Sequence, residues 1–349
     1  MKLKIVAAVA LLPVLVACGG GGGDDSGDGG GVDPDRGNTG GGDGGTTSST
    51  LDEDRTRPAA GNYSTTTAEI KDNGANPYAN EGPQQVNIDR VVAWPGLRYG
   101  DFLLTNNPWN ASAATYEDWY QDISLNESGS GVQAVIDWDW GASADTNGSL
   151  FNTKSYPEVI YGTKSLFERS GDFSKTGLPV EHYDSPVWSI DYAYSTEGRR
   201  SNSNSGGGTD SEYNIAIESF YHDSCDIKRT GAPTDNQIME IMVWLKVDQN
   251  KPSGQAPHPD PFTTSDGRVY DVYAKSSNFN YIAYVAREEQ TSGTVMYTEI
   301  LNDTFDNASK YGTYQLKDTD CLANILMGTE IWHGAGTFTL SDYQINRTY

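Results

Sequence analysis

The second half of the chain contains short apolar runs that alternate with polar residues and are separated by clusters of Gly, Pro, Asn, Asp and Ser. A period of two residues is the pattern of a β-strand with one buried face. Regularly spaced short strands with turn residues between them are typical of a sandwich or a barrel. We therefore predict an all-β fold, with the clearest strands at Tyr213 to Tyr221, Gln237 to Val247, Val269 to Ala274 and Tyr281 to Ala286.

One stretch has helical spacing instead. Apolar residues recur every three to five positions from Val295 to Ala308, and Ser292 or Thr294 is available as an N-cap. We expect this stretch to form one short helix, and the polar insertions at residues 196–212 and 250–267 to be loops.

The first part of the chain does not have the composition of a folded domain. Of the 39 glycines, 15 lie between residues 19 and 50, where Val32 is the one large apolar residue. Such a segment cannot bury enough surface to offset the entropy lost on folding. We predict a disordered Gly/Asp/Ser-rich tether at residues 19–57 and one domain with insertions at residues 58–349.

An export signal precedes this tether. Lys2 and Lys4 form a positive region, an apolar run follows up to Val16, and the run is too short to span a bilayer comfortably. The ending Leu15-Val16-Ala17-Cys18 resembles the bacterial lipobox, which implies cleavage before Cys18 and lipidation of its thiol. Gly19 next to it resembles lipoproteins of the outer membrane, so we expect residues 1–18 to be a signal peptide and the protein to be lipid-anchored there, facing the periplasm or the cell surface. An ordinary secretory signal is the alternative.

The net charge of the chain limits the kinds of partner that it can bind. The chain carries 24 basic and 48 acidic residues, for a formal charge of −24, of which −20 belongs to the domain. A surface this negative repels phosphate backbones and anionic polysaccharides, so we expect no nucleic-acid partner and a neutral ligand. High charge that only keeps the protein soluble is an equally good explanation. We expect a monomer.

Two cysteines remain once Cys18 is assigned to lipid. Cys225 and Cys321 either pair in an oxidising compartment or stay free. Together with four scattered histidines they offer no usual spacing for a metal site, and we expect neither metal nor cofactor.

The strand at residues 237–245 has an unusual second face. Met239, Ile241 and Val243 form an ordinary apolar face, whereas Glu240, Met242 and Trp244 form the other. A lone carboxylate between a thioether and an indole is too apolar for plain surface and too charged for a core. A sugar cleft requires this combination, because pyranose rings stack on aromatic platforms and a carboxylate must reach the reacting carbon.

Two further acids are candidates for the same chemistry. Glu218 can stand beside Glu240 if their strands form an antiparallel pair, and Glu330 follows the apolar run that ends at Met327. Retaining glycoside hydrolysis needs two carboxyl groups about 5 Å apart, one as nucleophile and one as acid and then base. Since 39 acids lie beyond residue 57, position alone does not single these out.

Five ordered motifs resemble glycoside hydrolase family 12, the jelly-roll endo-β-1,4-glucanases and xyloglucanases. They are Asn106-Asn107-Pro108-Trp109, Trp138-Asp139-Trp140, Lys154-Ser155-Tyr156-Pro157, Glu240-Ile241-Met242-Val243-Trp244 and Gly328-Thr329-Glu330. The resemblance is collinear from about Leu104 onward. It implies a jelly-roll β-sandwich with a concave substrate cleft and one short helix ahead of the last strands.

The resemblance also implies roles for individual residues. Glu240 would be the nucleophile, Glu330 the general acid/base and Glu218 the partner of the nucleophile, with retention of anomeric configuration. Five residues would line the cleft: Asn107, Trp109, Trp140, Met242 and Trp244. The implied substrate is cellulose-type glucan, mixed-linkage β-glucan or xyloglucan.

The chain departs from the family pattern near the acids. Glu218 stands where the family usually has Asp, Asn110 replaces a usual Gly, and Trp332 and His333 follow Glu330 in place of Pro-Phe. Two alternatives remain: a surface glycan-binding lipoprotein that has lost catalysis, and another jelly-roll glycanase such as a family 16 laminarinase. The latter carries Glu-x-Asp-x-x-Glu on one strand, where residues 240–245 here read Glu, Ile, Met, Val, Trp, Leu.

Overall fold

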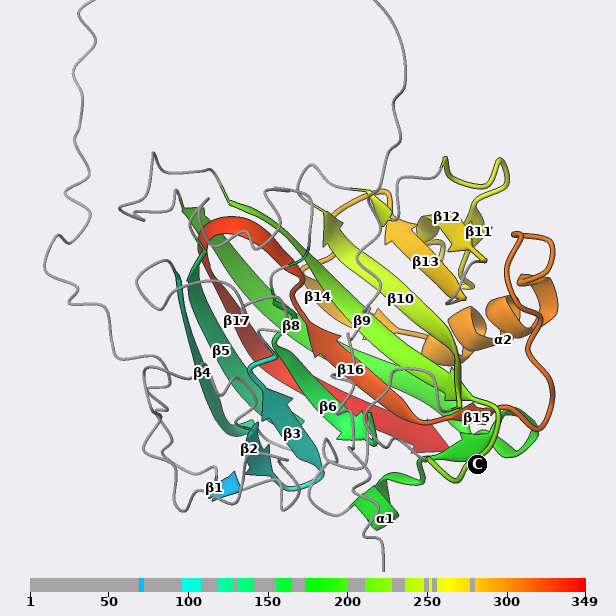
Figure 1. Cartoon of the computed structure of the whole chain (residues 1–349), viewed down its shortest axis with the longest axis horizontal. Coiled ribbons are helices and arrows are strands. Elements are labelled where there is room, and N and C mark those ends of the chain that lie inside the picture. Colours follow the sequence, from blue (N-terminus) through cyan, green and yellow to red (C-terminus); the bar gives the residue numbers. More distant parts are fainter. Residues whose placement is uncertain are drawn as a thin grey trace, which may run out of the picture.

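The computed structural model describes residues 69–71, 96–107, 119–128, 131–140, 153, 155–164, 173–199, 211–227, 236–247, 251–252, 256–276 and 280–349. The signal peptide and lipidated Cys18 predicted at residues 1–18, and the tether predicted at 19–57, lie outside these residues. In the described part, no helix is long and apolar enough to cross a membrane. The described strands form two sheets that pack face to face (Figure 1).

The larger sheet, sheet A, has the strand order β1–β2–β3–β6–β16–β9–β10–β13–β12–β11. All neighbours are antiparallel except β10 and β13, which are parallel. Two short strands, β15 (Cys321–Leu322) and β7 (Val180–Glu181), extend it beside β9. The bounds are β1 (Glu69–Lys71), β2 (Gly96–Tyr99), β3 (Phe102–Thr105), β6 (Glu158–Gly162), β9 (Glu212–His222), β10 (Gln237–Val247), β11 (Phe262–Thr263), β12 (Val269–Lys275), β13 (Tyr281–Ala286) and β16 (Asn324–Gly328).

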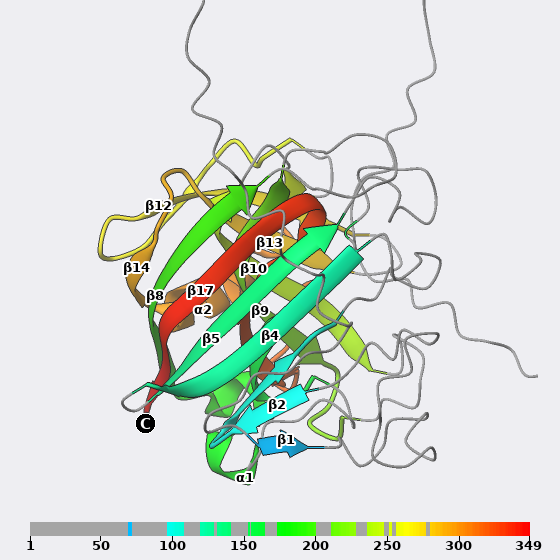
Figure 2. The same cartoon turned by 90° about the vertical axis from the view of Figure 1, so that its left-hand side faces the viewer.

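The smaller sheet, sheet B, is antiparallel throughout, with the order β4–β5–β17–β8–β14. Figure 2 shows β4, β5, β17 and β8 side by side toward the viewer. The bounds are β4 (Trp119–Ser128), β5 (Gly131–Trp140), β8 (Val187–Arg199), β14 (Ser292–Val295) and β17 (Ile331–Thr348).

Strand β17 belongs to both sheets. Its first residues, Ile331 and His333, pair with β9 of sheet A, and from Gly334 onward it pairs with β5 of sheet B. Gly334 has φ of 82°, a left-handed conformation that glycine adopts without strain. The chain therefore bends across the sandwich directly after Glu330.

The predicted strands and helix are present. Strands β10 and β13 have the predicted bounds, and β9 and β12 differ by one residue at each shifted end. Helix α2 (Tyr297–Asn307) precedes the last strands, and a single helical turn, α1 (Phe173–Thr176), was not predicted. The predicted N-cap is wrong, because Met296 occupies that position and Thr294 lies in β14, where its hydroxyl donates to Asp191.

The hydrophobic core lies between the two sheets. Met239, Ile241 and Val243 of β10 point into it, as predicted from their alternation. Trp188 of β8 is also fully buried there. Met242 and Trp244 belong to a separate cluster on the opposite face of sheet A, together with Tyr156, Ala216, Tyr273, Tyr281, Ala283, Val285 and Trp332.

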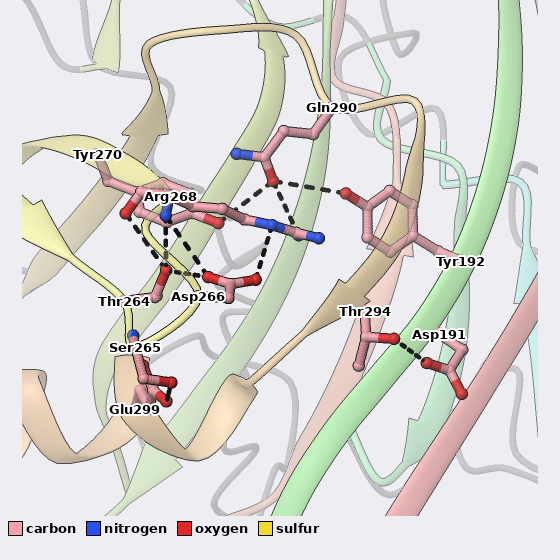
Figure 3. A network of polar contacts seen from close by, with 10 residues as sticks. All are labelled: Asp191, Tyr192, Thr264, Ser265, Asp266, Arg268, Tyr270, Gln290, Thr294 and Glu299. Atoms are coloured by element: carbon pink, nitrogen blue, oxygen red, sulfur yellow. Dashed lines mark hydrogen bonds and ion pairs between the residues drawn. The ribbon is translucent and has the colours of Figure 1, made fainter.

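A polar network joins the edges of the two sheets beside this core (Figure 3). Gln290 Oε1 accepts hydrogen bonds from Arg268 Nη1 at 3.1 Å, Tyr270 Oη at 3.3 Å and Tyr192 Oη at 3.5 Å. Arg268 also pairs with Asp266 at 3.0 Å. Because Tyr270 lies on β12 and Tyr192 on β8, the network ties the edge of sheet A to sheet B.

The disulfide between Cys225 and Cys321 is confirmed, with Cα atoms 5.2 Å apart. It ties the segment that follows β9 to β15, which is itself paired with β9.

Candidate active site

Glu218 and Glu240 lie together on the face of sheet A that is turned away from sheet B, which we call the acid face. Strands β9 and β10 are antiparallel, with Glu218 opposite Met242 and Glu240 opposite Phe220. The two glutamates are therefore diagonal neighbours on one face, and their side chains are within hydrogen-bonding reach of each other. The predicted pairing of these two acids is confirmed.

Glu330 is held next to the same strand by one asparagine. Asn214 Nδ2 donates to Glu330 Oε2 at 2.5 Å, and Asn214 Oδ1 accepts from the Glu330 backbone N–H at 2.9 Å. The backbone N–H of Asn214 donates to the Glu330 carbonyl at 3.0 Å. Four residues before Glu218 on β9, Asn214 thus fixes both the backbone and the carboxylate of Glu330.

A fourth buried carboxylate, Glu158, completes the acid face. It begins β6, its side chain is fully buried, and its Oε1 lies 2.5 Å from Lys164 Nζ. Asn107 Nδ2 also donates to this oxygen, at 3.3 Å. Sequence reasoning missed Glu158 and Lys164, although Glu158 directly follows the motif that ends at Pro157, which was the available signal.

Gly328 allows these strands to approach. A Cβ atom built on Gly328 would lie 2.3 Å from the Pro157 carbonyl oxygen and 2.9 Å from Glu158 Cα. Thr329 and Ile331 continue this contact by donating backbone hydrogen bonds to Pro157 and Ser155. The motif before Glu158 therefore packs directly against the segment that carries Glu330.

Asn107 comes from a corner that is fixed by the same motif. Its carbonyl accepts from the Tyr156 backbone N–H and from Ser155 Oγ, both at 3.0 Å. Its φ is 33°, in the positive region that asparagine tolerates better than most residues. The described parts of two motifs, residues 106–107 and 155–157, thus meet at the acid face, whereas Trp109 lies outside the described residues.

Tyr156 lies among the four carboxylates. Burial raises the pKa of its hydroxyl well above the ordinary value, and Glu218, Glu158, Glu330 and Glu240 raise it further. The Tyr156 hydroxyl and the Glu218 carboxylate are buried close together, near enough for a hydrogen bond that lowers the pKa of Glu218. Tyr156 is therefore in direct contact with the paired acids.

Burial governs the ionisation of the acids. It raises the pKa of Glu330 to about 8, with a further contribution from Glu218. Burial also raises the pKa of Glu240 and of Glu218, and the neighbouring Glu218 carboxylate adds to the rise at Glu240. Two carboxyl groups in contact titrate as a pair, so we assign one shared proton to Glu218 and Glu240, while Glu330 separately carries a proton at neutral pH.

Aromatic and sulfur groups border the acids. Trp244 packs on Trp332 with ring centroids 6.0 Å apart. Met242 Sδ accepts from Trp244 Nε1 at 3.4 Å and from Tyr281 Oη at 3.5 Å. Met242 and Trp244 share the face of Glu240, as the strand period predicts. Trp332, which lies two residues after Glu330, packs beside them on Trp244.

Trp140 lies elsewhere. We expected it to line the cleft, but the structure places it on β5 of sheet B, fully buried in the main core. Its indole N–H donates to Gln121 Oε1 at 3.1 Å. The motif that contains Trp138 and Trp140 therefore serves packing in this structure, because both rings point to the inner side of the sheet.

Among the described residues, no group of three or more His, Cys, Asp or Glu side chains is arranged to hold a metal ion.

The sequence matches no protein-family model and no curated protein. Solved structures are similar, however. A family 12 xyloglucanase from Bacillus licheniformis has a TM-score of 0.56 and 19% identity, over 72% of this chain and 97% of that one. Endoglucanase 3 of Trichoderma harzianum, from the same family, has a TM-score of 0.53 and 18% identity, over 73% of this chain and 95% of that one. The catalytic domain of Humicola grisea Cel12A, solved with a soaked thio-cellotetraose, has a TM-score of 0.51 and 20% identity, over 70% and 92%.

At these identities the likeness shows a shared fold. The family 12 enzymes are β-jelly rolls, and the two packed sheets of this chain have the same architecture, with one helix longer than a single turn among the described residues. The predicted fold class is therefore confirmed: the chain is an all-β protein with a jelly-roll sandwich.

Proposed function

We propose that this protein is a retaining, endo-acting glycoside hydrolase that cleaves internal β-1,4-glucosidic bonds. The observation that carries the proposal is the acid face itself, where the Glu218–Glu240 pair lies on β9 and β10 and a separately protonated Glu330 lies between β16 and β17, held by Asn214 of β9. Retaining hydrolysis uses two carboxyl groups in opposite protonation states. The jelly-roll fold shared with family 12 structures supports the same class.

The geometry suits a division of roles. Glu240 is the nucleophile, and Glu218 shares a proton with it and orients it. Glu330 protonates the departing glycosidic oxygen and then, as a carboxylate, takes a proton from the attacking water. Asn214 orients Glu330, because its amide bonds one carboxylate oxygen and leaves the other for the substrate.

A neutral β-glucan is the proposed substrate. Trp244 and Trp332 place two largely buried aromatic rings beside the acids, and we propose that they form the apolar border of the glucan site. The names of the similar structures, a xyloglucanase and endoglucanases, favour xyloglucan, mixed-linkage glucan or cellulose-type glucan. Cys18 and the tether at residues 19–57 would hold a monomeric enzyme at the outer membrane while it works on the polymer.

Two isosteric substitutions test the proposal. Glu240→Gln and Glu330→Gln each remove a reacting carboxyl group while keeping its shape, so each should lower hydrolysis of barley β-glucan or xyloglucan by at least about a hundredfold. Reducing-sugar release measures the loss, and circular dichroism checks the fold. Full activity in either variant would refute the assigned roles.

The stereochemistry gives an independent test. Proton NMR of the first product should show the β-anomer, and an initial α-anomer would exclude retention. A wild-type domain that binds glucan but cleaves neither cellulose derivatives, mixed-linkage glucan, xyloglucan nor xylan would instead be a glycan-binding protein.

A further inference from the structure

A buried ion pair lies at the edge of the acid face and has no part in the chemistry described above. Lys164 Nζ lies 2.5 Å from Glu158 Oε1, with the glutamate side chain fully buried and the lysine side chain 12% exposed. Removing two charges from water is expensive, and the pair often contributes little to stability compared with apolar residues. Its position among the acids suggests a different use.

The ammonium group of Lys164 is directed toward the Glu218–Glu240 pair. It lies 5.4 Å from the ring centroid of Phe220, the residue directly opposite Glu240 on β9. It also lies 5.7 Å from the ring of Tyr156, whose hydroxyl is surrounded by the carboxylates. Both rings flank the acids, so the cation stands beside the pair as well as beside Glu158.

The charged groups that face Lys164 come from four elements. They are Glu158 on β6, Glu218 on β9, Glu240 on β10 and Glu330 between β16 and β17, with the Tyr156 hydroxyl among them. Lys164 lowers the pKa of Glu218, Glu240 and Glu330, against the effect of burial. Glu158, the ion-pair partner of Lys164, also lowers the pKa of Glu218 through a side-chain hydrogen bond.

We propose that Lys164 is a positioning residue that keeps a negative charge on the Glu218–Glu240 pair, and that Glu158 holds the ammonium group in place for this role. This inference rests on the proposed function, because it concerns the ionisation of the proposed nucleophile. If Lys164 only anchored Glu158, its loss would alter stability and leave the ionisation of the pair unchanged.

Both partners should affect the pH profile in the same direction. Lys164→Met removes the cation, so the acid limb of kcat/KM should move to higher pH by about one unit. Glu158→Gln keeps the cation but removes the carboxylate that holds it and that lowers the pKa of Glu218, so the same limb should move to higher pH by a smaller amount. Lys164→Arg keeps the charge and should leave the limb close to that of the wild type.

A matched control removes a cation elsewhere. Arg287 forms an exposed ion pair with Asp271 at 2.8 Å, and Arg287→Gln should not move the acid limb. Thermal denaturation of every variant separates loss of fold from loss of charge. An unchanged acid limb in folded Lys164→Met would overturn the proposal, as would a shift of that limb to lower pH.

A direct titration separates this inference from the proposed function. In protein labelled with ¹³C at the glutamate carboxyl groups, NMR follows the titration of the pair, identified by the signals that change in Glu240→Gln. The apparent pKa should rise in Lys164→Met, and rise less in Glu158→Gln, whether or not the protein cleaves glucan. A wild-type protein that is inactive on every glucan would refute the proposed function, and an unmoved titration would refute the role of Lys164.

Discussion

Gly328 shows how closely the acid face is packed at the level of single residues. Its missing side chain is what lets the strand that leads to Glu330 lie against Pro157 and Glu158. A methyl group there would overlap backbone atoms, which cannot move as the end of a flexible side chain can.

Gly328→Ala should therefore destabilise the protein by about 2–4 kcal/mol and reduce activity, because Glu330 is displaced together with its strand. Urea denaturation measures the first effect. As a control, Gly267→Ala introduces a methyl group where no atom lies within 4 Å, at a φ of 88°, and should cost only about 1 kcal/mol. Equal stabilities of wild type and Gly328→Ala would contradict the packing described.

Single residues also show where sequence reasoning succeeds and fails. Glu218 and Glu240 could be paired from two alternating runs, since a period of two fixes which side chains share a face. The proximity of Glu158 and Lys164 to this pair could not be predicted. Strand β16 lies between β6 and β9, and nothing in the sequence indicates that these three strands are neighbours. The cleft position of Trp140 was expected from its motif alone, and the structure places it in the core between the sheets.

At the level of elements, strand interiors were predictable and their ends were not. Residues 196–199 have a loop-like composition, yet they continue β8 because they pair with residues 335–338 of β17. Similarly, β11 lies in a segment that we predicted to be a loop. It forms a strand because it pairs with β12. In both cases a partner distant in sequence decides the conformation, which local composition does not encode.

The Cys225–Cys321 disulfide acts on the stability of a whole group of elements. It joins residues 96 positions apart, and a crosslink over so long a loop restricts the unfolded chain strongly. The double variant Cys225→Ser, Cys321→Ser should lose about 2–4 kcal/mol of unfolding free energy. Urea denaturation of the oxidised wild type and the variant gives the difference, and reduction of the wild type should reproduce it. A variant as stable as the oxidised protein would show that the disulfide does not stabilise the fold by restricting the unfolded chain.

At the level of the whole molecule, the acid face makes stability depend on pH. The pKa of Glu330 is about 8 in the folded protein against an ordinary value of 4.5, and burial raises those of Glu218 and Glu240 as well. Between the unfolded and the folded pKa of these carboxyl groups, the folded state binds more protons than the unfolded state. Their contribution to stability is therefore greatest at low pH and is lost as pH rises through the folded pKa.

The melting temperature should therefore fall between about pH 5 and pH 8, with Glu330 alone contributing on the order of a few kcal/mol. Glu330→Gln removes this contribution and should make the fall shallower. Calorimetry across this range checks both expectations. A melting temperature that is constant or rises with pH would mean that these carboxyl groups are not protonated in the folded state.

The path of β17 has a consequence for truncated chains. Glu330 and the central strand of sheet B both lie within residues 330–348, after every other described strand in the chain. A chain that ends at α2 contains Glu218 and Glu240 but lacks both Glu330 and the strand that joins β5 to β8. Under the proposed roles, a chain truncated before Glu330 has no acid/base and should be inactive rather than weakened.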